Sequence, residues 1–421
     1  MLSLRNLCFV LINVVYVSQC VLAQGEVGVP FLLITPSPEA NGMGGISPST
    51  TTTNALSIIS NPAHIGMFSF DNYFSSALYS EKTEWLPYFG QNDLRYSSNA
   101  FVAGLNIGKL ITLPFGLSVG GGYSTIDLDL GKFVRTLNDP TPLGTFDAYE
   151  SAQAYSFGIG AEYIVKFGLG FTSRNITSHL SPVGSPSDTS LAEARPHATD
   201  FGMILQIPVA DLIANVRGGP VIAFRNTKLQ FDITTSYTRT NVGDGVTYLD
   251  AAYSDPLPRQ AGVGFSVDLG LATPVGDELW KTFTFTFARE VQDILVQRFS
   301  NGSWNYVSGF GQIRFFQNLF LGKWDGDVTL RKGWQINFAE IFYFRGGSVH
   351  MPGLEYKTSG FSIRTSGIFK LFRELDPTIQ DMPILGFVIK HIDVHFDQST
   401  EGETFSPRDG TMYRGFNIVL H

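Results

Sequence analysis

The sequence contains only two cysteines, Cys8 and Cys20, both within its first 20 residues. The rest of the chain can therefore form neither a disulfide framework nor a thiol site. Beyond residue 23 no apolar run reaches the length of about 20 residues that a membrane-spanning helix requires. Charged residues make up only 16% of the chain, and acidic residues outnumber basic ones by 37 to 29. This balance argues against a nucleic-acid partner.

Catalytic motifs are also lacking. The sequence has no Gly-x-Ser-x-Gly element, no phosphate-binding loop and no Cys-x-x-Cys pair. Gly120 to Gly122 form a glycine run without the lysine of a phosphate loop, which favours a bend in a strand. Asp127 and Asp129 alternate with apolar residues, and no nucleophile or general acid accompanies them at a recognisable spacing, so we interpret them as facing a barrel lumen. We expect no enzymatic activity and no cofactor.

The N-terminal segment, residues 1–23, has the features of a secretory signal peptide. Arg5 supplies a positive charge, Leu7 to Val17 is apolar, and Val21 and Ala23 are placed for cleavage after Ala23. Removing this segment would leave 398 residues (421 minus 23) with a formal charge of -9, because the -8 of the whole chain includes Arg5.

What the sequence has in abundance is glycine, with 44 residues, and phenylalanine, with 35. Many segments alternate apolar residues with small or polar ones at period two. In Tyr155 to Tyr163 the odd positions are mostly large and apolar, and the even ones are Ser, Gly, Gly and Glu. Such strands have one face for lipid and one for a lumen. Without spanning helices a membrane protein must be a closed barrel, since only closure satisfies every backbone hydrogen bond in lipid. The sequence therefore predicts an all-β, transmembrane antiparallel β-barrel, and the alternative is a soluble pair of β domains.

The alternating segments number about fourteen. We expect strands to start near Met67, Asn99, Phe115, Tyr149, Val165, Ala198, Arg217, Arg259, Trp280, Asp327, Ile341, Glu355, Ile384 and Thr411. Long polar connections are expected at 81–98, 135–148, 179–197, 238–258 and 399–410, with short turns between them. Long loops at one end and short turns at the other are typical of outer-membrane barrels.

Residues 300–323 form the ambiguous part of this pattern. They predict either a tenth strand near 307–319 or a structured loop before a strand at 327–338. We favour the loop because it keeps the strand count even.

The stretch from Phe31 to Met67 is rich in Gly, Pro, Ser and Thr but has apolar ends, which predicts an ordered, irregular segment. Its apolar start, a glycine-rich element and an Asn-Pro-Ala triplet together resemble the N-terminal hatch of the PorV/PorQ family, outer-membrane barrels related to FadL-type transporters. The tight hairpin predicted at Trp334 to Gly347 resembles the same family. The hatch residues that carry this resemblance are Phe31, Leu32, Leu33, Gly42, Met43, Gly44, Gly45, Asn61, Pro62 and Ala63.

The resemblance implies a FadL-like barrel of about 14 strands in the outer membrane of a Gram-negative bacterium, with residues 24–66 as hatch or plug and 67–421 as barrel. It further implies a PorV-like component of type IX protein secretion. The expected partners are outer-membrane lipid, the translocon and attachment-complex proteins, and the C-terminal domains of secreted cargo. The alternative function is a FadL-like channel for uptake or export of hydrophobic small molecules.

Two further groups of residues are candidates for sites. Trp85, Leu86, Tyr88 and Phe89 form an aromatic cluster in the first long loop, which suits either the interfacial aromatic belt or a protein contact. His391, Asp393, His395 and Asp397 would point the same way on a strand, so His391, Asp393 and His395 are a weak candidate for a metal site, or for a surface hydrolase. The competing interpretation of this face is a hydrated polar lumen.

Overall fold

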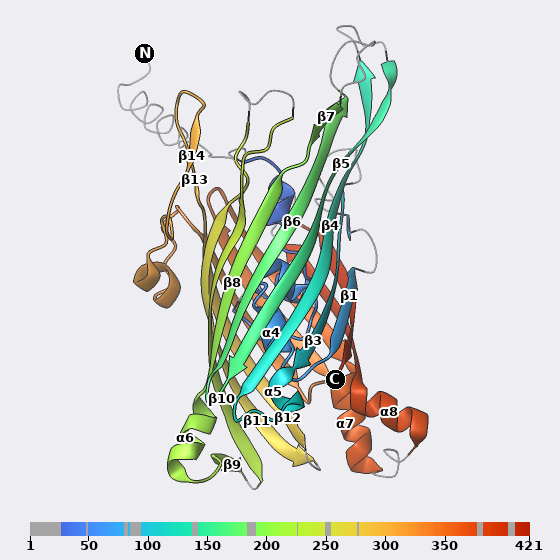
Figure 1. The fold of residues 1–421 in the computed structure, drawn as a ribbon, viewed down its shortest axis with the longest axis vertical. Helices are drawn as coiled ribbons and strands as arrows, with labels where there is room; N and C mark the ends of the chain where they lie inside the picture. Colours follow the sequence, from blue (N-terminus) through green and yellow to red (C-terminus); the bar gives the residue numbers. More distant parts are fainter. Residues whose placement is uncertain are drawn as a thin grey trace, which may run out of the picture.

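The computed structural model describes residues 27–47, 49–79, 83–84, 94–136, 142–182, 191–224, 226–248, 254–275, 278–376, 382–402 and 409–421. Within them, fourteen antiparallel strands close into a barrel with the N-terminal segment inside it (Figure 1). The barrel strands are, in chain order, β1 (Phe74–Tyr79), β3 (Arg95–Asn106), β4 (Gly116–Thr136), β5 (Pro142–Glu162), β6 (Lys166–Pro182), β8 (His197–Pro208), β10 (Thr227–Gly243), β11 (Gln260–Val275), β12 (Glu278–Ile294), β15 (Thr329–Phe338), β16 (Phe342–Met351), β17 (Leu354–Arg364), β18 (Ile392–Gly402) and β19 (Met412–Leu420).

The barrel closes between its first and last strands. β1 pairs with β19 in a continuous antiparallel register from Phe74 opposite Leu420 to Tyr79 opposite Gly415. On its other side β1 pairs with β3. Closure leaves no free sheet edge in the ring, which is the condition for a sheet to cross a membrane. The predicted fold class is confirmed.

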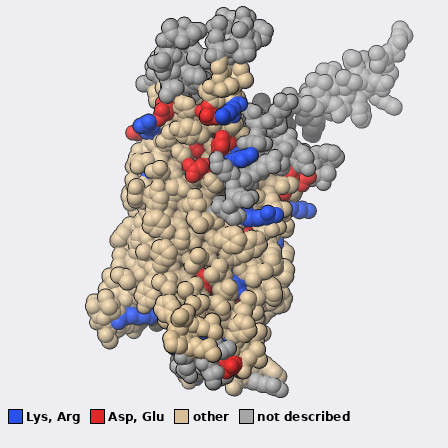
Figure 2. All heavy atoms as spheres, turned by 90° about the vertical axis from the view of Figure 1, so that its right-hand side faces the viewer, with Lys and Arg blue, Asp and Glu red and all other residues tan. Residues whose placement is uncertain are grey.

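Period-two alternation sets which side of the wall each residue faces. Along β5, Tyr155, Phe157 and Ile159 are exposed on the outside, whereas Ser156 and Gly158 are buried against the lumen contents. The other strands repeat this arrangement, so large apolar side chains cover the outer wall. One face of the molecule accordingly shows a broad band with few charged residues, and the charges gather toward the end that carries the long loops (Figure 2). An apolar exterior of this kind is the surface that a barrel presents to lipid.

Near the long-loop end of β4 the apolar and polar residues exchange sides of the wall. Ile126 and Leu128 are buried toward the lumen, whereas Asp127 is exposed on the outside. Our prediction that Asp127 faces the lumen is therefore wrong. The physical reason is height along the barrel: above the apolar band the outer wall meets water, and the apolar residues turn inward to pack on the hatch.

The two ends of the barrel differ, but the prediction of short turns at the end that carries the C-terminus holds only in part. Residues 163–165 join β5 to β6, and 339–341 join β15 to β16. The exceptions contain helices, namely α5 (Ile107–Leu110), α6 (Val209–Arg217) followed by β9 (Ile222–Phe224), and α7 (Thr365–Leu375) with α8 (Pro383–His391). In Figure 1, α6 and the α7–α8 pair project on opposite sides of this rim. No helix in the described ranges is long and apolar enough to cross a membrane.

Several strand starts differ from the prediction. Met67 lies in helix α4 (His64–Phe68), Arg217 ends α6, and Ile384 lies in α8. The strands that follow begin at Phe74, Thr227 and Ile392. In each case an apolar helical segment precedes the strand, and a short apolar run does not reveal by itself whether it is helix or strand. Residues 135–148, predicted as a loop, instead carry the ends of β4 and β5, which extend as a hairpin beyond the barrel.

The ambiguous segment 300–323 is not a barrel strand. It belongs to the connection between β12 and β15, which holds the small hairpin β13 (Val296–Arg298) and β14 (Trp304–Tyr306) and the π-helix η3 (Phe315–Phe320). The tenth barrel strand is β15, as preferred from the sequence. The predicted hairpin at Trp334 to Gly347 is confirmed, with Ala339 and Glu340 both at positive φ in its turn.

Candidate functional site: the hatch and its seat in the lumen

The hatch, predicted as residues 24–66, extends further: its described part, from residue 27 to residue 72, runs through the lumen from the long-loop end to the opposite rim, and the first barrel strand begins only at Phe74. At the long-loop end the Gly28 N–H donates to the Pro256 carbonyl at 2.9 Å, and at the other end the Tyr73 N–H donates to the Leu420 carbonyl at 2.9 Å. Between them lie η1 (Pro30–Leu33), α2 (Pro38–Gly42), α3 (Ser57–Ser60) and α4. Most described residues of this segment are buried, although the chain has little regular structure there.

An apolar core joins the hatch to the inner wall. Phe31, Leu32, Leu56 and Ile58 of the hatch cluster with inward-facing wall residues such as Tyr96. The wall residues of this cluster include Ala100, Val102, Ile126, Leu128, Ala152, Ile176, Ala198 and Tyr413. The wall also buries many polar side chains, among them Ser98, Thr172 and Asn417, so the hatch rests on apolar and polar wall surface together.

The Asn61-Pro62-Ala63 element and α4 lie against wall positions that have no side chains. A Cβ added at Gly158 would lie 2.7 Å from Ile65 Cβ, and one at Gly168 would lie 2.8 Å from the Ala63 carbonyl oxygen. Asn61 is fully buried; its side-chain carbonyl accepts from the Ala63 N–H at 3.0 Å and its amide donates to the Met203 carbonyl at 3.3 Å. We call this the glycine seat. Its members are Gly104, Gly120, Gly122, Gly158, Gly160, Gly168, Gly170 and Gly202.

The glycine-rich element of the hatch meets the predicted hairpin. The Gly44 N–H donates to Thr358 Oγ1 at 2.9 Å, and Arg331 donates to the Gly44 carbonyl at 3.0 Å. Gly44 adopts φ of 77°, and a Cβ there would lie 3.0 Å from the Lys332 carbonyl oxygen. Gly333 and Gly347 of the hairpin in turn face Met43 and Gly44. The glycine-rich element and the hairpin, both singled out in the sequence, thus contact each other.

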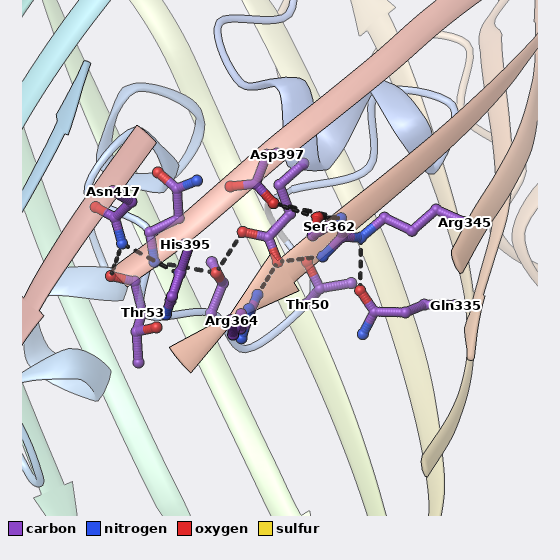
Figure 3. A network of polar contacts seen from close by, with 12 residues as sticks. Thr50, Thr53, Gln335, Arg345, Ser362, Arg364, His395, Asp397 and Asn417 are labelled. Atoms are coloured by element: carbon purple, nitrogen blue, oxygen red, sulfur yellow. Dashed lines mark hydrogen bonds and ion pairs between the residues drawn. The ribbon is translucent and has the colours of Figure 1, made fainter. Parts of the chain in front are cut away.

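A buried ionic cluster also ties α2 to the wall (Figure 3). Glu39 Oε1 accepts from Arg345 Nη2 at 3.1 Å and from Arg364 Nη2 at 2.8 Å. Arg345 also lies 3.5 Å from Asp397 Oδ1, and Ser362 bonds both Arg345 and Asp397. Arg345 and Asp397 are almost completely buried. We call Glu39, Arg345, Arg364 and Asp397 the ionic lock.

The same strand face continues this network. His395 Nε2 donates to Asp393 Oδ2 at 2.7 Å, and its Nδ1 faces the Asn417 amide at 3.4 Å. The Asn417 amide also lies 3.4 Å from the Thr53 carbonyl of the hatch, and Ser75 donates to that carbonyl at 2.9 Å. The polar face of β18 is therefore linked to the hatch through Arg345 and Asn417, and its Asp393, His395 and Asp397 side chains are buried.

On the opposite wall a second buried ion pair reaches the hatch. Arg174 Nη2 lies 2.6 Å from Asp200 Oδ2 and donates to the Ile59 carbonyl at 3.4 Å. Arg174 also donates to Asn241, which sits at a bulge where the register of β10 against β8 shifts between Arg239 and Val242. Asn241 has a positive φ of 55°. The wall is irregular where it holds the end of α3.

Two hatch groups have shifted pKa values. Burial alone would raise the pKa of Glu39, but the positive charges of Arg364 and Arg345 lower it to about 2. Burial lowers the pKa of His64 to about 4. Neutral His64 donates from Nε2 to the Ser47 carbonyl at 3.0 Å. At neutral pH the hatch therefore carries an ionised Glu39 and a neutral His64.

Of the three candidate metal residues, Asp393 and His395 contact each other, but His391 does not join them. His391 is the last residue of α8, not part of β18, and its Nδ1 lies 3.2 Å from the His421 carbonyl oxygen. The expectation that His391 shares a strand face with Asp393 and His395 is wrong, because the helix ends one residue too late. Among the described residues no group of three His, Cys, Asp or Glu side chains is placed to share a metal ion. The aromatic cluster of Trp85, Leu86, Tyr88 and Phe89 lies outside the described residues.

A cavity of about 60 Å³ lies between the start of the hatch and the inner wall. Leu32, Leu33 and Ile34 line one side, and Arg174 and Asn241 the other. Apolar cavities that bind benzene measure about 150 Å³, so this space admits water but no hydrocarbon. A ligand of that size could pass here only if the hatch moved.

The fold and site together define a class: a plugged, fourteen-stranded β-barrel with an apolar exterior. No protein-family model matches the chain, and no curated protein matches it. Among solved structures it is similar to the *Pseudomonas putida* toluene transporter TodX, at 12% identity and a TM-score of 0.36, over 90% of this chain and 96% of that one. 

The chain is also similar to the CymD monoaromatic hydrocarbon channel, at 10% identity and a TM-score of 0.34, over 92% of this chain and 97% of that one. A Pseudomonas aeruginosa FadL homologue is similar at 10% identity and a TM-score of 0.29, over 92% of this chain and 97% of that one. Scores this low carry no argument about function, and the fold class rests on the closed strand order itself.

Proposed function

We propose that this protein is a FadL-like barrel of the Gram-negative outer membrane that passes hydrophobic small molecules, with the hatch as its gate. It performs no enzymatic chemistry in this proposal. The observation that carries it is the apolar core inside a lumen whose wall is otherwise rich in polar residues: Phe31, Leu56 and Ile58 pack on apolar wall residues. Once the hatch shifts, the apolar wall residues of this core, such as Ile126 and Leu128, are uncovered and suit apolar solutes.

The hatch holds the gate closed in this proposal. The cavity beside Leu32 to Ile34 is the place where a small displacement would first create room, since it adjoins the bulge at Asn241. The ionic lock and the glycine seat hold the other end. Transport therefore requires that hatch segments leave the wall.

A disulfide staple tests this requirement. A Cβ at residue 168 would lie 3.1 Å from Met67 Cγ, so Met67→Cys with Gly168→Cys places two sulfurs within bonding reach of each other. Residues 27–421 contain no other cysteine. We expect Gram-negative cells making the protein to take up a labelled monoaromatic hydrocarbon or long-chain fatty acid, the oxidised staple to abolish this uptake, and a reductant to restore it.

The two single variants, Met67→Cys and Gly168→Cys, serve as matched controls because they carry the same substitutions without the bond. Met67→Cys should transport under oxidising conditions, and Gly168→Cys, whose Cβ would lie 2.8 Å from the Ala63 carbonyl oxygen, shows how far crowding of the seat alone changes uptake; neither should respond to the reductant. Uptake that is equal with the staple closed and open, or that never exceeds that of cells lacking the protein, would contradict the gate.

The second candidate is the PorV-like secretion role. The observation that favours it is a lobe on the β12–β15 connection, residues 307–327, which packs on the outer wall at Phe265 and carries several exposed aromatic side chains. Its exposed residues include Phe310, Phe315, Phe316, Phe320, Leu321 and Trp324. Such a surface suits a translocon, an attachment-complex protein or the C-terminal domain of a cargo protein. Co-purification in mild detergent with a giant barrel and with secreted proteins that share a C-terminal domain would support this role, and would be expected to persist with the staple closed.

A further inference from the structure

The rim opposite the long loops carries more apolar surface than its turns require. Three connections there contain helices: the α5 turn, the α6–β9 segment and the α7–α8 pair. We call them the helical collar. Its exposed apolar side chains are Leu110, Ile111, Ile213, Val216, Ile222, Phe224, Leu371, Phe372, Leu375, Met382, Ile384, Leu385 and Phe387.

The α7 helix is firmly attached to the barrel along one side. Gly367 packs on the β15–β16 turn, where an added Cβ would lie 2.6 Å from Ile341 Cγ1. Lys370 Nζ lies 2.5 Å from Glu340 Oε2, and Asp393 accepts from the Ser366 N–H at 2.7 Å. The attached side therefore determines which side chains are left pointing outward.

The outward side of the pair is apolar. On α7, Leu371, Phe372 and Leu375 are exposed, and on α8 Ile384 is 82% exposed and Phe387 55%. Lys390 lies near the end of α8. A helix with one apolar face, attached beside a lipid-facing wall, has the features of an interfacial helix at the boundary of headgroups and acyl chains.

The distribution of the collar around the rim identifies what covers it. The α6–β9 segment, with Val216 at 89% and Phe224 at 68% exposed, projects on the side opposite α7 and α8 (Figure 1). A protein partner would meet one side of the barrel, whereas a bilayer surrounds all of it. The collar also adjoins the short-turn ends of strands β15 and β16. The exposed side chains there, Phe338 and Phe342, belong to the apolar outer wall.

We infer that the helical collar lies in the interfacial layer of the membrane leaflet at the short-turn end, with its apolar face against the acyl chains. This inference rests on the proposed membrane location of the barrel. The collar fixes the height of the barrel in the bilayer and prevents its tilt. What covers the apolar face of the helical collar is a lipid leaflet.

Single-cysteine spin labelling tests this placement, because residues 27–421 contain no native cysteine. The protein, lacking residues 1–23, is reconstituted in vesicles of phosphatidylethanolamine and phosphatidylglycerol. Nitroxides are placed by Ile384→Cys, Phe387→Cys and Val216→Cys. Collisions with molecular oxygen, which concentrates in lipid, are compared with collisions with a water-soluble nickel chelate.

Two control positions calibrate the measurement. Leu269→Cys lies on the outer face of β11, and Asn301→Cys lies in the exposed turn of the β13–β14 hairpin. All of these positions are exposed, so the labels should not disturb folding. We expect the oxygen-to-nickel ratio at the collar positions to exceed that at residue 301 several-fold and to fall short of that at residue 269.

Each other outcome overturns the inference. A ratio at the collar equal to that at residue 301 places the helices in water. Low accessibility to both reagents places them against protein, in this sample a second copy of the chain. If residue 269 itself reports water, the membrane location fails as well, so that failure is distinguished from failure of the collar alone.

Discussion

At the scale of single residues, Glu39 is the counter-charge on which the hatch attachment depends. It is the acidic partner that the hatch supplies to Arg345 and Arg364, and its Oε2 accepts from Thr52 at 3.0 Å. Arg345 retains Asp397 at 3.5 Å as a second, longer contact. Breaking a buried ion pair from one side costs more than the pair contributes, because the remaining charge stays buried without compensation.

We expect Glu39→Gln to weaken the attachment of the hatch by about 3 kcal/mol, the lower end of values for broken buried pairs. Hydrogen–deuterium exchange of the hatch segment 27–47 in detergent micelles would show faster exchange, while the strands change little. Asp71→Asn is the matched control, since Asp71 pairs with Lys109 on the surface and both side chains are well exposed. Unchanged hydrogen–deuterium exchange of the hatch in Glu39→Gln would show that the ionic lock does not hold the hatch.

The residues of the ionic lock were not predicted, and the reason is distance along the chain. Arg345 and Glu39 are 306 positions apart. An arginine at an inward position of a strand is visible in the sequence, but its partner depends on how the hatch folds inside the closed barrel. Glu340, the acidic residue nearest to Arg345 in the sequence, pairs with Lys370 of α7.

At the scale of elements, the glycine seat makes a prediction that separates contact with the hatch from strand propensity. Gly158 and Gly121 lie on neighbouring strands, but a Cβ at Gly158 would contact Ile65, whereas one at Gly121 meets only the Ser156 carbonyl oxygen at 3.6 Å. We expect Gly158→Val to displace α4 at a cost of about 1–3 kcal/mol, as for other overpacked sites. Gly121→Val should leave the hatch in place, and exchange of residues 57–72 measures both. Equal behaviour of the two variants would mean that α4 is not held by this seat.

The element scale also shows what the sequence could and could not predict. Period two was sufficient for β5, β12 and β19, since each residue there faces either lipid or lumen. It failed at the starts of β1, β10 and β18, where helices α4, α6 and α8 precede the strands with apolar residues of their own. The hatch motifs were visible as glycine, asparagine and proline, but the wall glycines that receive them were interpreted only as small inward residues. Their role depends on what fills the lumen.

At the scale of the whole molecule, the barrel and hatch behave as two parts joined by titratable contacts, so pH should separate them. Released from the lumen, His64 would regain an ordinary pKa of 6.5, whereas in place its pKa is about 4. The released state thus binds more protons between these values. Hatch attachment is complete above pH 6.5 and weakens as pH falls toward about 4, by about 3 kcal/mol in total.

Glu39 acts in a lower range. Its pKa in place is about 2, against an ordinary 4.5, so its contribution is complete above 4.5 and is lost as pH falls toward 2. The two groups therefore weaken the hatch in sequence, His64 first. Acid loosens the hatch while the strand ladder of the wall, which contains neither group, persists.

The expected result is that hydrogen exchange of the hatch, corrected for the intrinsic effect of pH, accelerates between pH 6.5 and 4. His64→Gln should make hatch exchange independent of pH in this range, because the glutamine amide can still donate to the Ser47 carbonyl but does not titrate. His197→Gln is the matched control, since His197 is exposed and contacts Ser173 on the wall, and it should keep the pH dependence of the unaltered protein. A pH dependence that survives in His64→Gln would assign the loosening to another group and leave the barrel without this link between proton binding and the gate.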